Sequence, residues 1–448
     1  MTALPEAFDR ELAEADAPQL RTELPGPLAR AAVERDERVT SPSLPRAYPL
    51  VPRRASGCVV EDVDGNLLLD FNAGIAVTST GHCHPEVVAA IREQAGELLH
   101  YSASDFYVPS YAELCEELAR VFPGEKPAKA FLTNSGTEAV EAAIKLARWH
   151  TRRQYVIAFF GSFHGRSYGS VSLTASKAHY RAGFAPLLPG IYHAPYADSF
   201  RPGRPDPEME FDTLRYLEQV LFKRLVDPEE VAALVVEPIQ GEGGYVVPPP
   251  GWLASLRELC DRFGILLVAD EVQSGAGRTG KMWAVEHTGV EPDILVAGKG
   301  IASGLPLGAI VANENVFSWT PGTHGSTYGG SPVACAAGLA TLRLLEGGLI
   351  ENAAVTGQRL LDGLARIAEQ SELIVETRGA GLMAGVELAD HDTAAAVEHE
   401  CFIRGLLVLG AGDAAVRISP PLVVDAPRID RGLGIFGEAL AAAAAHVT

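Results

Sequence analysis

The 448-residue chain has no apolar run long enough to cross a membrane, and basic side chains are scarce relative to acidic ones. Its formal net charge is −20 at pH 7, with 57 Asp and Glu against 37 Lys and Arg. A negative mean field opposes binding to nucleic acid or to an anionic membrane surface. The first residues are acidic and contain no apolar signal-peptide core. We therefore expect a cytoplasmic protein that binds neither nucleic acid nor membrane.

Cysteine and lysine are both infrequent. The six cysteines are scattered and form no C-x-x-C pair, which argues against a disulfide scaffold or a zinc site and predicts reduced thiols. No bound metal is expected. Of the seven lysines, only Lys299 lies between glycines directly after an apolar run.

Strands and helices alternate between residue 129 and about residue 331, a pattern typical of a parallel sheet covered by helices on both faces. Residues 1–80 are interpreted as an N-terminal arm and part of a small domain, with a hairpin pattern at 59–71. Residues 81–335 form the expected large domain. Residues 336–448, where helices and strands mix, form the expected C-terminal small domain. The predicted fold class is α/β with a second, smaller domain.

Two predicted core strands end in an acid and an amine. One apolar run, 265–269, is followed by Asp270, and a second, 294–297, is followed by Gly298 and Lys299. In open α/β sheets, ligands bind beside the carboxyl ends of the strands. Pyridoxal 5'-phosphate (PLP) chemistry needs a lysine that forms a Schiff base with the aldehyde and a carboxylate that keeps the pyridinium nitrogen protonated. Taken singly, such an Asp is more often a turn residue or helix cap, and a lone lysine is more often a solvated surface group.

The glycine-rich loop after this acid matches two nucleotide-binding patterns. Residues 275–280 fit G-x-G-x-x-G, and residues 275–281 fit most of a P-loop. A P-loop next requires Ser or Thr for magnesium, where this chain has Met282. The dinucleotide motif opens a long helix, whereas residues 282–289 are too short and irregular for one. Neither match predicts a nucleotide site.

A third strand end carries small polar residues. An expected strand at 130–133 is followed by Ser135, Gly136 and Thr137 at the start of a helix. Free backbone N–H groups and the helix dipole make such an N-terminus suitable for an anion. An ordinary N-cap by Ser135 or Thr137 is the alternative, but a cap alone does not require the glycine. Together with the strand-end acid and amine, the pattern favours a phosphate site.

Further candidates follow other apolar runs. In FFGSFHGR, Phe163 is either a ring that stacks on a pyridine or a core residue, and His164 is either a site residue or a structural histidine. Arg166 is harder to explain as core. Glu237 ends the run ALVVEP, beside a glycine-rich loop at 241–244.

Arg417 lies between apolar residues in VRISP. An arginine in such surroundings is either half of a buried ion pair or a bidentate clamp for a substrate carboxylate. The spacing leaves both interpretations open.

The ordered motifs of the chain match one family from about Tyr48 to the C-terminus. They are NAGIAV, GHCHPEVVAAI, TNSGTEAVEAAIKLAR, FHGR, EPIQGEGG, ADEVQSGAGRTG, AGKGIASGLPLGA and HGSTYGGSP. With them the chain resembles the class III (ω-amino acid) PLP-dependent aminotransferases of fold type I. The resemblance implies a large domain with a mostly parallel seven-stranded sheet covered by helices, and a smaller α+β domain built from both termini.

The resemblance also implies roles in binding PLP. Lys299 would be the Schiff-base lysine and proton carrier, and Asp270 would pair with the pyridine nitrogen. Ser135, Gly136 and Thr137 would hold the phosphate. Thr327 would complete the phosphate site of the neighbouring subunit, so a homodimer or higher homo-oligomer is expected.

Five more residues would line the cofactor. Phe163 would stack on one face of the pyridine ring while Val272 packs on the other. Gln273 would contact the phenolic oxygen. His164 and Glu237 belong to the same expected cofactor site, with Glu237 near the arginine of FHGR.

Three residues would bind substrate according to the resemblance. Arg417 would bind the α-carboxylate of glutamate or 2-oxoglutarate, and Glu242 would mask it by an ion pair when the donor has no carboxylate at that place. Arg166 would bind the far carboxylate of 4-aminobutyrate or the α-carboxylate of ornithine.

The function implied is transfer of the terminal amino group of an ω-amino acid, of the 4-aminobutyrate or ornithine type, to 2-oxoglutarate. An acetylornithine-type aminotransferase and an amino acid racemase on the same scaffold are the alternatives, because each reaction begins with loss of a proton from the amine-bearing carbon. A third hypothesis is a non-catalytic protein that uses this fold for binding. The presence of Lys299, Asp270 and Arg417 argues against it.

Overall fold

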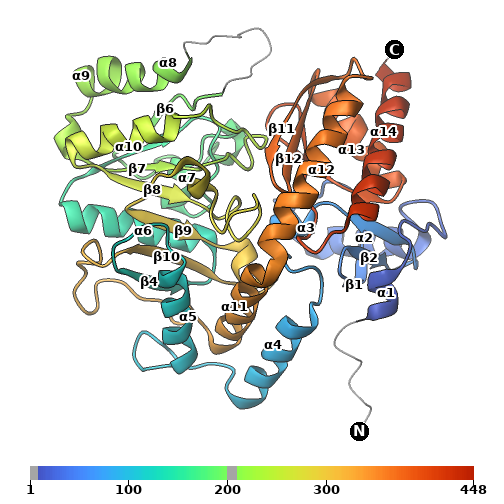
Figure 1. The fold of residues 1–448 in the computed structure, drawn as a ribbon, viewed down its shortest axis with the longest axis horizontal. Helices are drawn as coiled ribbons and strands as arrows, with labels where there is room; N and C mark the ends of the chain where they lie inside the picture. Colours follow the sequence, from blue (N-terminus) through green and yellow to red (C-terminus); the bar gives the residue numbers. More distant parts are fainter. Residues whose placement is uncertain (1–8, 199–208, 448) are drawn as a thin grey trace.

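The computed structural model describes residues 9–198 and 209–447, with a seven-stranded sheet at the centre of the larger part (Figure 1). In spatial order its strands are β4 (Ala128–Thr133), β10 (Gly308–Asn313), β9 (Ile294–Ala297), β8 (Leu266–Asp270), β7 (Val231–Val236), β5 (Tyr155–Phe159) and β6 (Ile191–Ala194). β10 runs antiparallel to both of its neighbours, whereas the pairs from β9 to β6 are all parallel. The predicted mostly parallel sheet is confirmed.

Helices cover both faces of this sheet, as the α/β pattern requires. α6 (Gly136–Thr151) packs its buried alanines and leucines on one face. α5 (Pro109–Arg120), α10 (Trp252–Phe263) and α11 (Pro332–Leu344) pack on the other. Successive strand residues point to opposite faces, so the apolar strands are buried on both sides. Elsewhere the described chain forms the helices α3 (Ala73–Ala76), α4 (Pro85–Glu97), α7 (Tyr168–Leu173), α8 (Met209–Tyr216) and α9 (Phe222–Arg224).

The smaller part of the molecule contains two four-stranded sheets. One has the order β1 (Pro52–Ser56), β2 (Val59–Asp62), β3 (Leu67–Asp70) and β13 (Leu406–Leu407). The other has the order β11 (Ile374–Ala380), β12 (Met383–Leu388), β15 (Ala415–Ile418) and β14 (Leu409–Ala411). β13 lies parallel to β3, so segments from both ends of the chain share one sheet, which confirms the predicted smaller α+β part. The boundaries after residues 80 and 335 stay predictions.

Helices at both ends of the chain complete this part. They are α1 (Arg10–Glu14), α2 (Pro27–Val39), α12 (Ile350–Ala368), α13 (His391–Ile403) and α14 (Ala426–Val447). Figure 1 shows α12 and α14 side by side at the right, and α12 continues from α11.

The helical stretch Pro332–Ala368 is long and apolar enough in composition to cross a membrane. It joins α11 to α12 through a π-helical turn in which Gly348 adopts a φ of 129°. α11 packs against α4 and α5 and buries Ala334, Cys335 and Ala337. These are the contacts of a core helix.

The strand that carries Asp270 offers a direct test of this core. Leu267 in β8 is 0% exposed and belongs to the main apolar cluster. Replacing Leu267 by Ala should lower the free energy of unfolding by about 2–5 kcal/mol, because a cavity remains where the side chain was. Urea unfolding followed by circular dichroism measures the change. The same substitution at Leu225, which is 61% exposed, should stay within about 0.5 kcal/mol of wild type. Equal losses in both variants would contradict this packing.

Candidate active site

Lys299 and Asp270 meet at the carboxyl edge of the sheet. Asp270 is the last residue of β8, and Lys299 follows the neighbouring parallel strand β9. Lys299 has a φ of 44°, in the left-handed region that residues other than glycine seldom adopt. Such strain in a non-glycine residue is found where the surrounding structure fixes a functional group.

The environment of Lys299 favours its neutral amine. Burial, followed by the nearby Arg417 cation, lowers the pKa of the Lys299 ammonium to about 8. The carboxylates of Asp270, Glu237 and Glu242 act in the opposite direction and do not cancel the effect. A lysine with a lowered pKa is a nucleophile near neutral pH.

The carboxylate of Asp270 is held by His164 and by the backbone. Asp270 is 4% exposed. Its Oδ2 lies 2.7 Å from His164 Nδ1, and its Oδ1 accepts a hydrogen bond of 3.1 Å from the Val272 amide. Burial opposes a charge on His164, but its hydrogen bond to Asp270 and the attraction of that carboxylate raise the pKa of the imidazole. His164 therefore fixes the orientation of the acid, and its Nε2 has no partner among the described residues.

The N-terminus of α6 lies next to this pair. Ser135 caps the helix by accepting a hydrogen bond of 3.3 Å from the Glu138 amide. A Cβ on Gly136 would lie 2.7 Å from Val272 Cγ1, so only glycine fits between α6 and the segment after Asp270. The hydroxyl of Thr137 lies 2.8 Å from that of Ser167. The glycine thus brings the backbone N–H groups of the helix close to the site.

Glu237 organises the loops beside the site. Its two carboxylate oxygens accept hydrogen bonds of 3.0 Å from the amides of Phe163 and Gly241. Burial raises the pKa of Glu237 to about 7. Gln273 is 8% exposed, and its Oε1 has no partner among the described residues. Glu237, which follows β7, therefore holds the backbone of Phe163 and the start of the loop at Gly241.

The two candidate substrate arginines have different environments. Arg417 on β15 is 4% exposed, and its Nη1 donates a hydrogen bond of 3.0 Å to Glu242 Oε2. Arg166 is exposed, and its guanidinium lies 4.4 Å from the centre of the Tyr180 ring. Tyr180 also donates a hydrogen bond of 2.9 Å to Glu242 Oε1. Sequence reasoning missed Tyr180, because no local pattern around it points to a site.

Thr327 lies at the surface of this chain. Its neighbour Ser326 accepts a hydrogen bond of 3.2 Å from Asn134 Nδ2, just before the N-terminus of α6. The expected use of Thr327 by a second subunit stays a prediction.

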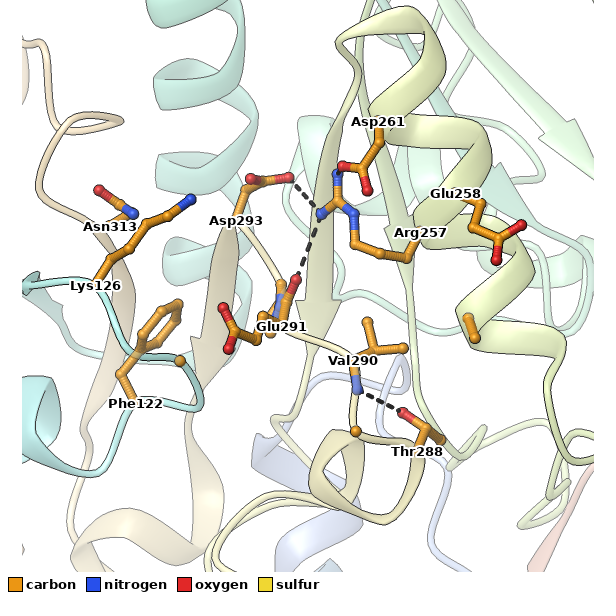
Figure 2. Close-up of a pocket in the computed structure, with 14 residues that line it drawn as sticks. Phe122, Lys126, Arg257, Glu258, Asp261, Thr288, Val290, Glu291, Asp293 and Asn313 are labelled. Atoms are coloured by element: carbon orange, nitrogen blue, oxygen red, sulfur yellow. Dashed lines mark hydrogen bonds and ion pairs between the residues drawn. The ribbon is translucent and has the colours of Figure 1, made fainter.

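A separate cavity of about 460 Å³ lies at the opposite edge of the sheet, where β8 and β9 begin (Figure 2). Arg257 there pairs with Asp293 at 2.7 Å and with Asp261 at 2.8 Å. Asp293 also accepts a hydrogen bond of 2.8 Å from the Leu267 amide. These interactions join α10 to the start of two strands, which explains the cluster as structural.

The residues at the carboxyl edge fit PLP. The N-terminus of α6 suits a phosphate dianion, and position 136 at this end of the helix has no room for a side chain. The buried carboxylate of Asp270 suits a protonated pyridine nitrogen, and the amine of Lys299, with its lowered pKa, suits the aldehyde.

Comparisons with known proteins show the family of this chain. The family model for aminotransferase class-III matches residues 42–440. The 4-aminobutyrate aminotransferase of Escherichia coli is 40% identical over 89% of this chain and 96% of that protein. The alanine/serine racemase of Pyrococcus horikoshii is 36% identical over 97% of this chain and 94% of that protein.

A solved structure also shares the fold. The ornithine aminotransferase of Toxoplasma gondii has a TM-score of 0.83 at 31% identity, over 95% of this chain and 96% of that structure. The chain therefore belongs to the class-III aminotransferases, a family of PLP-dependent transaminases.

Proposed function

We propose that this enzyme transfers the terminal amino group of an ω-amino acid, of the 4-aminobutyrate or ornithine type, to 2-oxoglutarate. The observation that carries the proposal is the pair formed by Arg417 and Glu242, with Arg166 close by on the other side of Tyr180. A dicarboxylate such as 2-oxoglutarate needs two separate cations, and an ω-amine donor needs only one.

The masked arginine accommodates both substrates in turn. With Glu242 on Arg417, the charge of Arg417 is neutralised, and a donor that presents no carboxylate there is accepted. With Glu242 displaced, Arg417 is free to clamp the α-carboxylate of the acceptor. Arg166 binds the remote carboxylate of a 4-aminobutyrate-type donor and of 2-oxoglutarate, or the α-carboxylate of ornithine.

Bound PLP supplies an electron sink for the carbanion that forms when the amine-bearing carbon loses its proton. Lys299 would hold the cofactor covalently until the substrate amine displaces it, and its freed neutral amine would then be the group that accepts that proton. Asp270, oriented by His164, keeps the pyridine nitrogen protonated. Ser135, Gly136 and Thr137 would hold the phosphate, Phe163 and Val272 would enclose the ring, and Gln273 would bind its phenolic oxygen.

We also infer a cytoplasmic homodimer or higher homo-oligomer in which Thr327 completes the phosphate site of the neighbouring subunit. The exposed position of Thr327, beside the segment that precedes α6, supports this inference.

A racemase is the second candidate, because a relative of that name is 36% identical over 97% of this chain. Its reaction would begin with the same transfer of a proton from the amine-bearing carbon of the substrate to Lys299. Exchange of the Cα hydrogen of a chiral amino acid for solvent deuterium without formation of an oxo acid would favour it over the aminotransferase.

A donor panel tests the proposed function. Arg166→Ala should lower the single-turnover rate with 4-aminobutyrate by at least about tenfold, since charge-assisted hydrogen bonds to the carboxylate are lost. Propylamine, which is 4-aminobutyrate without its carboxylate, should react equally well with wild type and variant. Loss of the PLP absorbance band in stopped flow gives the rates. Arg359→Ala, at an exposed arginine paired with Asp430, is the control and should change neither rate. A uniform loss with both donors would show that Arg166 supports the fold or the cofactor instead.

Lys299→Ala should abolish covalent attachment of PLP and lower turnover by at least about 10²–10⁴-fold, because both the anchor and the proton carrier are removed. Borohydride reduction followed by peptide mass spectrometry locates the attached cofactor. Lys281→Ala, at an exposed lysine in the glycine-rich loop, should keep the label at residue 299. Reduced PLP on another lysine of the Lys299→Ala variant would refute the assignment.

A further inference from the structure

Tyr180 lies between the two substrate arginines. It is 9% exposed and ends a 3₁₀ turn, Ala178–Tyr180. Its hydroxyl donates a hydrogen bond of 2.9 Å to Glu242 Oε1. Its ring packs edge-on against Phe163, with 5.5 Å between the ring centres, and carries the guanidinium of Arg166 at 4.4 Å. One side chain thus touches both halves of the expected substrate site.

The carboxylate of Glu242 is fixed at both of its oxygens. Oε2 accepts a hydrogen bond from Arg417 at 3.0 Å, and Oε1 accepts one from the Tyr180 hydroxyl. Among the described residues, Lys177 is the only other cation in an ion pair with Glu242, and its Nζ lies 3.9 Å from Glu242 Oε1. Burial first, and then the Glu242 charge, raises the pKa of Tyr180 to about 12, so the phenol remains a hydrogen-bond donor at neutral pH.

The backbone at Glu242 and after it is fixed independently of Tyr180. The Gly412 amide donates a hydrogen bond of 2.7 Å to the Glu242 carbonyl oxygen. Arg378 donates two hydrogen bonds, of 3.0 and 2.7 Å, to the Gly244 carbonyl oxygen. Because the smaller part of the molecule holds this backbone in place, the Glu242 side chain must rotate for Glu242 to leave Arg417 or return to it.

We propose that Tyr180 is a specificity-determining residue that holds Glu242 on Arg417 and thereby sets the balance between ω-amine donors and substrates with an α-carboxylate. This inference rests on the proposed function. The hydroxyl of Tyr180 favours the masked state, and its ring supports Arg166 in both half-reactions. Tyr180 acts through Glu242 and is a positioning residue.

Tyr180→Phe separates these two roles, because it removes the hydroxyl and keeps the ring beneath Arg166. Loss of a hydrogen bond to a charged group shifts the equilibrium of Glu242 toward the unmasked state by about tenfold. The ratio of kcat/KM for glutamate to kcat/KM for 4-aminobutyrate should therefore rise about tenfold, and the KM for 2-oxoglutarate should fall. General damage to the fold would lower both rates and would not improve the use of 2-oxoglutarate.

Single-turnover kinetics with glutamate and with 4-aminobutyrate, and steady-state kinetics with 2-oxoglutarate, measure these changes on the PLP-loaded enzyme. Tyr192→Phe is the matched control. Tyr192 lies on β6, where its ring packs on Tyr155 with 5.6 Å between the ring centres, and its variant should keep the wild-type ratio.

The outcomes separate this inference from the proposed function. An unchanged substrate ratio and an unchanged KM for 2-oxoglutarate in Tyr180→Phe, with a wild type active on 4-aminobutyrate, would overturn the role of Tyr180 alone. A wild type that reacts with glutamate but with no ω-amine would overturn the proposed function. In that case an unchanged KM for 2-oxoglutarate in the variant would overturn the role of Tyr180 as well.

Discussion

The ion pair between Arg417 and Glu242 is the interaction on which the proposed substrate site depends. Arg417 is 4% exposed, and removing one partner of a buried charge pair costs about 3–5 kcal/mol. Glu242 therefore leaves favourably only when another carboxylate takes its place, and in the proposed function a substrate α-carboxylate is that replacement. The pair also connects a loop of the larger part of the molecule to strand β15 of the smaller part, which puts the proposed substrate site where the two parts meet.

Much of the site could be predicted because parallel strands deliver their final residues to one edge of a sheet. Apolar runs revealed β8 and β9, and Asp270 and Lys299 lie where those runs end. The glycine at the start of α6 signalled a close approach, which the structure explains by the 2.7 Å from a Cβ at Gly136 to Val272. The antiparallel direction of β10 could not be predicted, because the sequence of a buried apolar strand has the same pattern whether the strand is parallel or antiparallel to its neighbours.

The rest depends on contacts between residues far apart in the sequence. His164 lies 106 residues from Asp270, and Arg417 lies 175 residues from Glu242, so no local pattern reports either pair. For Arg417 the sequence left an ion pair and a carboxylate clamp as equal alternatives. The structure contains the ion pair, and the proposed function uses the same arginine as a clamp when Glu242 is displaced. Tyr180 belongs to an irregular segment without periodicity, and only its contacts reveal it.

The most direct test of this account compares the two half-reactions of an Arg417→Ala variant. Burst rates with 4-aminobutyrate and the KM for 2-oxoglutarate would be measured on the same PLP-loaded preparation. The proposed role of Arg417 predicts that the KM for 2-oxoglutarate rises by at least about tenfold, because a bidentate charge-assisted clamp is lost, while the donor half-reaction stays within a few-fold of wild type. Equal damage to both half-reactions would contradict it and would leave Arg417 as a structural ion-pair residue.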